Sequence, residues 1–323
     1  PSPKAIKAYN SIGKGFVRYP DSDGTFFRKV LAKKFKLERN RIILGSGSDQ
    51  IFELICKSFI DKNDEVIVPE FSFIIYRIYS KIYGAKIKYA KEKNFKISIN
   101  NILSKVTKKT KIVFLANPNN PTGTFIDDSK IKYLLDKLSD NILMVIDGAY
   151  AEYIENFDAG LSLVNNHNNL IILRTFSKIY GLAALRVGWS YSSSWITKII
   201  NQVRGPFNIS SPAIAAAVAA VLDVDYTRDC LVENLKNREW LSRELKDLGL
   251  KITDSKANFL LVDFNSENQA NKVFSFLKNQ NIYVRKVTDY GLSKSLRITV
   301  GTNDECKLVK KNVQKFLELD NGL

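Results

Sequence analysis

The sequence predicts an α/β fold with a mainly parallel sheet, followed by a smaller α+β region. Over the first two thirds of the chain, short β-rich apolar runs alternate with helical stretches. These runs are almost continuously apolar, as expected for parallel strands that helices cover on both faces. From about Ser211 the pattern changes to an alanine-rich helix, a long charged helix and short strands. We therefore expect two domains.

The expected elements follow these patterns along the chain. The strands of the large domain are predicted at 41–44, 64–68, 85–89, 111–116, 141–146 and 170–173, with helices at 49–60 and 127–138. In the smaller domain, helices are predicted at 213–222 and 227–248, and strands at 259–262, 282–284 and 296–300. We predict that the large domain spans 20–210 and that the small domain combines 1–19 with 211–323.

Composition narrows the possible functions. The chain of 323 residues is long enough to bury a large core. Its net charge is +16, but lysines spread along the whole chain instead of forming one stripe, so we expect no nucleic-acid partner. No apolar run approaches the roughly 18 residues that a membrane span needs, so we expect no membrane partner either.

Histidine and cysteine are scarce. A single histidine, His167, excludes a multi-histidine metal site, and we expect no metal. The three cysteines, Cys56, Cys230 and Cys306, are odd in number and widely spaced. We interpret them as reduced thiols, which is typical of a cytoplasmic protein.

Polar motifs follow the ends of several predicted strands, where open α/β sheets bind their ligands. After the first strand, Gly-Ser-Gly-Ser-Asp-Gln at 45–50 opens a helix. Glycines let the backbone approach a ligand, and a helix N-terminus presents unpaired N–H groups to an anion. We expect the amides of Ser48 and Asp49 to bind a phosphate; an ordinary loop with an aspartate cap is the alternative.

Two further motifs follow the next central strands. In Asn-Pro-Asn-Asn-Pro-Thr-Gly at 117–123, the prolines and the glycine define a tight turn that points the Asn120 amide at a set place. Asp147-Gly-Ala-Tyr150 follows the strand at 141–146. A carboxylate at that position can face a ligand ring, although an aspartate that caps the next element is the alternative.

The segment Thr-Phe-Ser-Lys-Ile-Tyr-Gly at 175–181 follows the last of these strands, and Arg186 comes eight residues after Lys178. A carbonyl-trapping lysine beside a phosphate cradle is what pyridoxal 5′-phosphate (PLP) chemistry requires. Lys178 would form the Schiff base, while Thr175, Ser177 and Arg186 would hold the phosphate. A lysine near an arginine is often a solvated face in so basic a chain, but all four motifs in this order favour a PLP site.

The residues at 117–123 and 175–188 carry a specific resemblance, which extends from 1–6 through Leu-Arg-Ile-Thr-Val-Gly at 296–301. The chain resembles the fold type I PLP enzymes of the aspartate aminotransferase superfamily. Within it, the chain is most similar to the histidinol-phosphate aminotransferase family. The resemblance implies a large PLP-binding domain with a mainly parallel, seven-stranded, aspartate aminotransferase-like sheet, and a smaller α+β C-terminal domain.

The resemblance also implies roles for individual residues. Lys178 matches the catalytic Schiff-base lysine, which also moves the substrate proton, and Asp147 matches the partner of the pyridinium nitrogen. Asn120 and Tyr150 match the ligands of the ring oxygen. Ser48, Asp49, Thr175, Ser177 and Arg186 match the phosphate cradle.

One aromatic residue is expected to stack on the cofactor ring. The family places it three residues before a tyrosine, which here selects Phe73 ahead of Tyr76. More residues than usual separate Pro69 from Tyr76, so Phe71 is a second candidate.

Three further residues are matched, one at the cofactor phosphate and two at the substrate. Tyr19, in Arg-Tyr-Pro-Asp, resembles a tyrosine that reaches the PLP phosphate of the neighbouring subunit, which implies a homodimer with shared active sites. Arg297 resembles the substrate-anion arginine of the superfamily, and Arg285 a second arginine of the histidinol-phosphate branch. Two arginines suit a dianionic phosphate and one suits a carboxylate; a solvated strand residue is the alternative for Arg285.

Asn120 is also expected beside the substrate. Members of the family usually carry, ahead of the position of Pro1, a segment with an Asn-Glu motif that packs over the substrate.

The predicted function is PLP-dependent transamination of L-histidinol phosphate with 2-oxoglutarate, in histidine biosynthesis. Aromatic amino-acid transamination is the first alternative, because the sequence does not separate the two substrate classes. Decarboxylation of a phosphorylated amino acid on the same scaffold is the second. A PLP-binding regulatory module is a third, which the lack of an upstream DNA-binding domain in this sequence disfavours.

Overall fold

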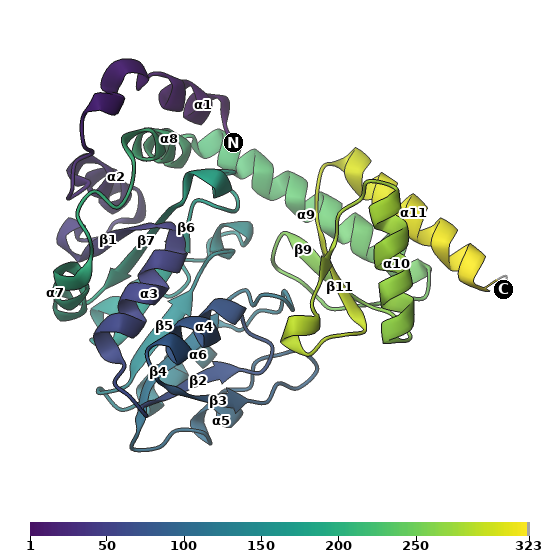
Figure 1. The fold of residues 1–323 in the computed structure, drawn as a ribbon, viewed down its shortest axis with the longest axis horizontal. Coiled ribbons are helices and arrows are strands. Elements are labelled where there is room, and N and C mark those ends of the chain that lie inside the picture. The colour runs from purple at the N-terminus through teal and green to yellow at the C-terminus, as the bar shows by residue number, and fades with distance from the viewer. Residues whose placement is uncertain (322–323) are drawn as a thin grey trace.

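The computed structural model describes residues 1–321, and a seven-stranded sheet forms the centre of its larger part (Figure 1). The strand order is β1-β7-β6-β5-β4-β2-β3. Strand β7 is antiparallel to both of its neighbours, and the other pairs are parallel. The strands are β1 (Ile42–Ser46), β2 (Glu65–Pro69), β3 (Lys86–Ala90), β4 (Thr110–Ala116), β5 (Leu143–Asp147), β6 (Leu170–Thr175) and β7 (Val187–Ser192).

The predicted α/β class and the mainly parallel seven-stranded sheet are confirmed, and the six predicted strands lie within two residues of observed ones. The seventh strand, β7, was not predicted. It carries Ser190 and Ser192, both fully buried, and these polar residues interrupt the apolar run that marks the other strands. Their burial is possible because β7 lies between β1 and β6 and is covered on both faces.

Helices pack on both faces of the sheet, and side-chain alternation within each strand divides the core between them. In β4, Ile112 and Phe114 face one core cluster, whereas Val113 and Leu115 face the other. The first cluster is closed by α3 (Gly47–Phe59), α4 (Ile74–Ile82) and α7 (Ser194–Val203). The second is closed by α2 (Thr25–Phe35), α5 (Ile99–Leu103), α6 (Asp128–Lys137) and α8 (Ser211–Leu222).

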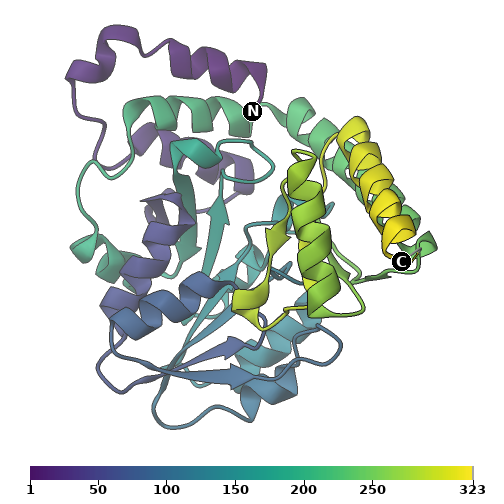
Figure 2. The same ribbon diagram turned by 45° about the vertical axis from the view of Figure 1, so that its right-hand side comes forward.

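Helix α1 (Pro3–Asn10) lies against α8, although the two are far apart in sequence (Figure 2). Lys4 of α1 pairs with Asp223 at 2.7 Å, and both helices contribute alanines to the core beneath the large sheet. The division into 20–210 and 1–19 with 211–323 stays a prediction. Helix α8 ends at Leu222 and the next helix begins at Val224.

The smaller part is an antiparallel sheet of order β10-β11-β9-β8, covered by helices on one side (Figure 1). Its elements are α9 (Val224–Asp247), β8 (Lys251–Ile252), β9 (Phe259–Asp263), α10 (Glu267–Asn279), β10 (Arg285–Lys286), β11 (Ser295–Thr299) and α11 (Asn303–Asn321). The predicted strand at 282–284 is wrong, because Ile282 is buried by packing and the ladder begins only at Arg285.

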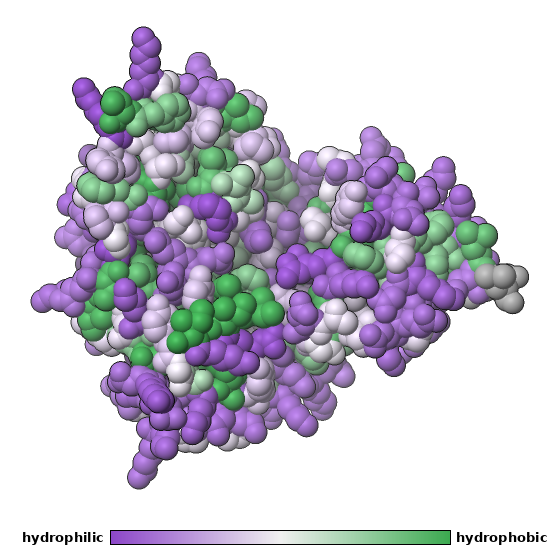
Figure 3. Space-filling model, viewed as in Figure 1, coloured by the Kyte–Doolittle hydropathy of each residue, from purple (hydrophilic) through white to green (hydrophobic). Residues whose placement is uncertain are grey.

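Short 3-10 helices complete the elements, at Gly13–Val17, Arg39–Arg41, Ala151–Tyr153, Leu161–Asn165, Ala183–Leu185 and Thr288–Tyr290. Hydrophilic side chains cover most of the smaller lobe on the face shown in Figure 3. Within residues 1–321, no helix is both long enough and apolar enough to cross a bilayer.

We expect Gly188→Ala to destabilise the fold. A Cβ at Gly188 in β7 would meet the backbone of Gly47 and Ser48, where α3 begins, and backbone atoms yield less readily than side chains. Overpacking of this kind costs about 1–3 kcal/mol. Urea unfolding of the variant, beside Gly205→Ala, measures the effect. A Cβ at Gly205 meets open space, so that control should stay within about 0.5 kcal/mol of the wild type; equal behaviour of the two variants would contradict the prediction.

Candidate active site

One cavity of about 220 Å3 brings together all but one of the residues that the sequence predicts for the site. Those that line it are Ser48, Asp49, Phe73, Asn120, Asp147, Tyr150, Thr175, Ser177, Lys178, Arg186, Arg285 and Arg297. The exception is Tyr19, which the sequence assigned to a neighbouring subunit. Its side chain is 81% exposed and stacks on Phe207, with ring centroids 4.7 Å apart.

The fold explains this convergence. Strands β4, β5 and β6 are parallel neighbours, so their carboxyl ends meet at one edge of the sheet. Asp147 is the last residue of β5 and Thr175 the last of β6, and the turn with Asn120 follows β4. The small sheet adds Arg285 and Arg297 from β10 and β11.

Asp147 is a buried carboxylate in the wall of the cavity, 6% exposed. The Tyr76 hydroxyl donates to Oδ2 at 2.5 Å, and the Ala149 amide donates to Oδ1 at 3.0 Å. Burial raises the pKa of Asp147 to about 6, while the two hydrogen bonds and the charge of Lys178 oppose that rise. Within residues 1–321, Asp147 has no ion-pair partner, so a cationic ring nitrogen would supply the charge that this carboxylate lacks.

Hydrogen-bond donors gather at the beginning of α3. Its first turn has no side-chain cap, so the amides of Ser48 and Asp49 are available to an anion. Arg186 adopts a left-handed backbone conformation, at φ 53°, and donates to Ser177 Oγ at 3.3 Å. Gly47 lies against its guanidinium, and any Cβ there would collide with it.

The Arg186 guanidinium also contacts Asp49 Oδ2 at 3.3 Å, with both side chains close to half exposed. Such a solvated pair is worth little, so an incoming phosphate can replace the carboxylate at the guanidinium. Thr175 and Ser177 complete this end of the cavity, with their hydroxyls 3.0 Å apart.

Lys178 follows β6 and is the lysine in the cavity lining. Its Nζ lies 5.3 Å from the centre of the Tyr150 ring. That ring packs edge-on against Phe259 of the small sheet, with centroids 5.2 Å apart. The amine therefore lies beside a ring of the large domain that the small sheet supports.

Two arginines of the small sheet complete the lining. Arg285 and Arg297 are direct partners in the antiparallel β10–β11 pair, and within residues 1–321 no carboxylate forms an ion pair with either. Like charges placed opposite each other destabilise a sheet. The Arg297 Nε atom is also buried without a hydrogen-bond partner among the described residues, and burial lowers the pKa of this side chain. This facing pair of arginines therefore favours an anionic ligand.

Arg297 also orients Asn120. Its Nη1 donates to Asn120 Oδ1 at 2.6 Å, and its guanidinium lies 4.8 Å from the centre of the Phe259 ring. Because the amide oxygen is taken by the arginine, the Nδ2 group of Asn120 remains to donate to a ligand. This orientation suits the phenolic oxygen of a pyridoxal ring.

The two candidate stacking residues have different surroundings. Phe73 lines the cavity, whereas Phe71 packs on Phe95, with ring centroids 5.6 Å apart, in a cluster between the two sheets. The geometry therefore favours Phe73 as the stacking residue, which the sequence also placed first.

Sequence reasoning missed three contributors. Tyr76 and the Ala149 amide hold Asp147, and Phe259 supports both Tyr150 and Arg297. For these three groups, the one sequence signal was the position of Tyr76, three residues after Phe73. Nothing in the sequence connects Tyr76 with Asp147, which lies 71 positions away.

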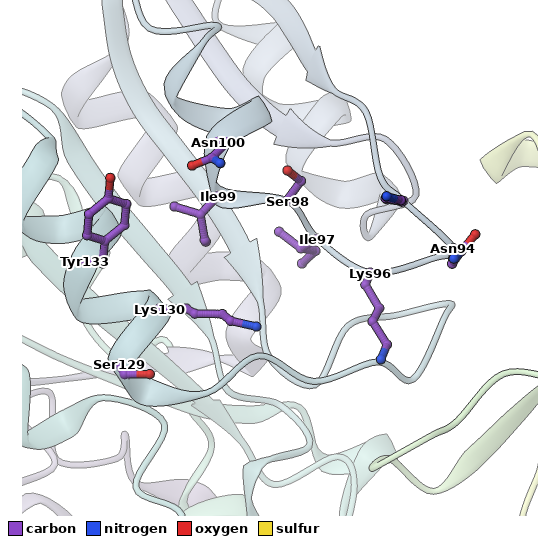
Figure 4. A pocket seen from close by; sticks show the side chains of 10 residues that line it. Asn94, Lys96, Ile97, Ser98, Ile99, Asn100, Ser129, Lys130 and Tyr133 are labelled. Carbon is purple, nitrogen blue, oxygen red and sulfur yellow. The ribbon is translucent and has the colours of Figure 1, made fainter.

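A larger pocket, of about 590 Å3, lies elsewhere on the large domain (Figure 4). Its lining includes the lysines Lys93, Lys96 and Lys130 and the apolar side chains of Ile97 and Ile99. None of the predicted site residues lines it, and its described lining includes no carboxylate.

The donor set of the smaller cavity fits PLP: an anion cradle at α3, a buried carboxylate without a cation, an oriented amide donor and one amine. Together with the doubly covered seven-stranded sheet, these groups define the class of a fold type I PLP-dependent enzyme.

The comparisons identify the family. The chain belongs to the class I and II aminotransferases, whose family model matches residues 1–311. It is 42% identical to the histidinol-phosphate aminotransferase of Ruegeria sp. (strain TM1040), covering 98% of this chain and 87% of that one. The enzyme of the same name from Dinoroseobacter shibae is 44% identical, covering 98% and 88%. The resemblance seen in the sequence is thereby confirmed, as are the enzyme class and the PLP cofactor.

Solved structures show the same fold. Histidinol-phosphate aminotransferase from Sinorhizobium meliloti, in complex with PLP, matches with a TM-score of 0.93 at 24% identity, covering 98% of this chain and 88% of that one. L-threonine-O-3-phosphate decarboxylase from Porphyromonas gingivalis matches with a TM-score of 0.85 at 20% identity, covering 97% and 95%. At these identities the likeness extends to the fold, and the fold does not separate transamination from decarboxylation.

We expect Asp147→Asn to stabilise the cofactor-free protein. Because the folded pKa of about 6 lies above the ordinary value of 3.8, the wild type loses stability as pH rises from about 4 to 6 and does not regain it above. An asparagine carries no charge to desolvate, so near pH 7 the variant should be more stable by about 2–3 kcal/mol, with the gap closing toward pH 4. Urea unfolding across this range measures it.

The matched control for that experiment is Asp140→Asn, which makes the same chemical change at an exposed site. We expect its stability to follow the wild type at every pH. A stability gap for Asp147→Asn that does not depend on pH would show that desolvation of the charge is not its cause.

Proposed function

We propose that the protein transfers the amino group of L-histidinol phosphate to 2-oxoglutarate, which yields imidazole-acetol phosphate and glutamate, in histidine biosynthesis. The observation that carries the proposal is the facing pair Arg285 and Arg297, which lacks carboxylate partners among residues 1–321 and lines the cavity. Two adjacent guanidinium groups match the charge and the several oxygen acceptors of a phosphate dianion. Relatives of that name, at 42% and 44% identity over nearly the whole chain, support the same substrate.

The cavity residues have separate tasks in this reaction. Bound PLP supplies a carbonyl that an amine can add to, and a ring that accepts the electrons of a broken Cα–H bond. Lys178 Nζ would take the proton from the substrate carbon and pass it to the carbonyl carbon of the cofactor, so that the amino group stays with the cofactor. The Asp147 carboxylate would hold the proton of the ring nitrogen, and Asn120 Nδ2 with the Tyr150 hydroxyl would hold the ring oxygen. Ser48, Asp49, Thr175, Ser177 and Arg186 would hold the cofactor phosphate, and Phe73 would cover the ring.

The substrate phosphate and the reacting carbon would contact different groups in the cavity. Arg285 and Arg297 bind the anion on the small sheet, while Lys178 meets the reacting carbon at the end of β6. A substrate anchored at both ends is oriented before the chemistry begins.

We also propose a homodimer that shares its active sites through Tyr19. The segment around Tyr19 exposes large apolar groups to solvent: Phe16 is 66% exposed, Val17 86% and Tyr19 81%. A shallow cavity of about 410 Å3 lies between this segment and residues 210–212. Exposed apolar patches of this kind favour burial against a partner.

A cytoplasmic location is supported by the cysteines Cys56, Cys230 and Cys306, which form no disulfide with one another.

Arg285→Gln tests the proposed substrate. Loss of one charged contact to the phosphate should lower kcat/KM for L-histidinol phosphate by about 10- to 100-fold, and that for phenylalanine by much less. Steady-state assays with 2-oxoglutarate measure both. Lys286→Gln is the matched control, because Lys286 is the next strand residue, faces the other way and lies 4.7 Å from the Phe274 ring. It should leave both substrates unaffected.

The same assays separate the alternatives. A wild type that prefers phenylalanine, with no effect of Arg285→Gln, would indicate an aromatic amino-acid aminotransferase. Release of CO2 from a phosphorylated amino acid without an oxo acid would indicate a decarboxylase.

Mixed dimers test the shared site. Lys178→Ala alone should abolish turnover, and Tyr19→Ala alone should weaken PLP binding at both sites. If Tyr19 serves the partner, a dimer of one subunit of each kind contains one site with both native residues. Refolding equal amounts of the two variants together should therefore restore about a quarter of wild-type activity, because about half of the dimers are mixed and each has one intact site. Activity no higher than the average of the separate variants would rule out a shared site.

A further inference from the structure

Tyr76 lies on α4, behind the cavity, and is not among the residues that line it. It is fully buried, and its hydroxyl donates to Asp147 Oδ2 at 2.5 Å. This contact joins a helix on one face of the sheet to the carboxyl end of β5. A second donor, the Ala149 amide, reaches the other carboxylate oxygen at 3.0 Å.

The ring of Tyr76 is held on three sides by aromatic side chains. It stacks on Phe114 of β4 at 4.9 Å with an interplanar angle of 6°, and Phe52 of α3 packs against it at 5.0 Å. Phe73, the residue favoured for the cofactor ring, meets it edge-on at 5.8 Å and 87°. Because packing leaves this ring one orientation, the direction of its hydroxyl is determined before any ligand arrives.

The two donors bias Asp147 toward its charged form. An ionised carboxylate accepts hydrogen bonds at both oxygens, and these bonds are stronger than those that a neutral carboxyl group would make. Burial raises the pKa of Tyr76 well above its ordinary value, so the hydroxyl stays protonated and continues to donate. The charges that act on Asp147 are the cation of Lys178, which favours ionisation, and the carboxylate of Asp49, which opposes it.

We propose that Tyr76 is a positioning residue of the reaction: its hydroxyl keeps the Asp147 carboxylate ionised and oriented toward the ring nitrogen of bound PLP, while its ring sets the position of Phe73. Tyr76 thus holds Asp147, which would lie at the edge of the cofactor ring, and supports Phe73, which would lie on the face of that ring. Each Asp147 oxygen has more than one lone pair, so the bond from Tyr76 leaves room for a donor from the ring.

This role rests on the proposed PLP chemistry but does not depend on the identity of the amine substrate. Tyr76→Phe removes the hydroxyl and retains the ring, so the packing on Phe114 and Phe73 is preserved. Tyr79→Phe makes the same change one turn later on α4, outside the site, and is the matched control.

The first measurement uses the cofactor-free protein. The carboxyl 13C resonance of Asp147, assigned by its loss in Asp147→Asn, should titrate about one pH unit higher in Tyr76→Phe than in the wild type. Tyr79→Phe should leave it in place. An unchanged midpoint in Tyr76→Phe would overturn the proposal, whatever the substrate proves to be.

The second measurement is a double-mutant cycle on PLP affinity. Tyr76→Phe should raise the Kd for PLP by about 3- to 30-fold in the native background, and by much less in an Asp147→Asn background, since its effect passes through the carboxylate. An equal loss in both backgrounds would show that the hydroxyl acts through packing instead, and would overturn the proposal.

The third measurement compares kinetic parameters with L-histidinol phosphate at saturating PLP. We expect Tyr76→Phe to lower kcat with little change in KM, because in the proposed function Arg285 and Arg297, and not Asp147, bind the substrate anion. A change confined to KM would contradict the assigned role. If the protein proves inactive toward this substrate, the proposed function fails, while the titration and the affinity cycle still test Tyr76.

Discussion

A desolvated carboxylate at the end of a central strand is the constraint on which this site depends. Asp147 is held at the end of β5 by two donors and within residues 1–321 has no paired cation, so its environment is complete only when a cationic ring lies against it. In the proposed site, the cost of burying that charge in the free protein would become binding energy for the cofactor. Stability and function are therefore opposed at this residue, as is common where a site is built in advance of its ligand.

The second constraint is the meeting of two sheets. The large sheet positions Lys178 and the residues proposed to hold the cofactor ring and phosphate, while the small sheet supplies the facing arginines. Asn120 and Phe259 connect the two, since Arg297 contacts both of them. The position of the substrate relative to the cofactor is thus set by packing between the sheets.

Much of this was predictable from local sequence. Near-continuous apolar runs identified six strands, because buried parallel strands need apolar residues on both faces. The motifs at 45–50, 117–123, 147–150 and 175–186 could be placed at strand ends for the same reason. The prediction of strands from apolar runs failed at two places. Strand β7 buries serines, and Ile282 is buried without being part of a strand.

The sequence by itself determined which chemistry is possible, because the amine, the carboxylate, the amide donor and the cationic groups are side chains whose reactivity belongs to the residue type. Only the tertiary structure decided which of these side chains come into contact. It also decided how strongly their surroundings shift their pKa values. Tyr76 is the clearest case: its hydroxyl serves Asp147 across 71 positions of sequence, through the stacking of helix α4 on the sheet. No local sequence pattern predicts such a contact, because it forms only when helix α4 packs on the large sheet.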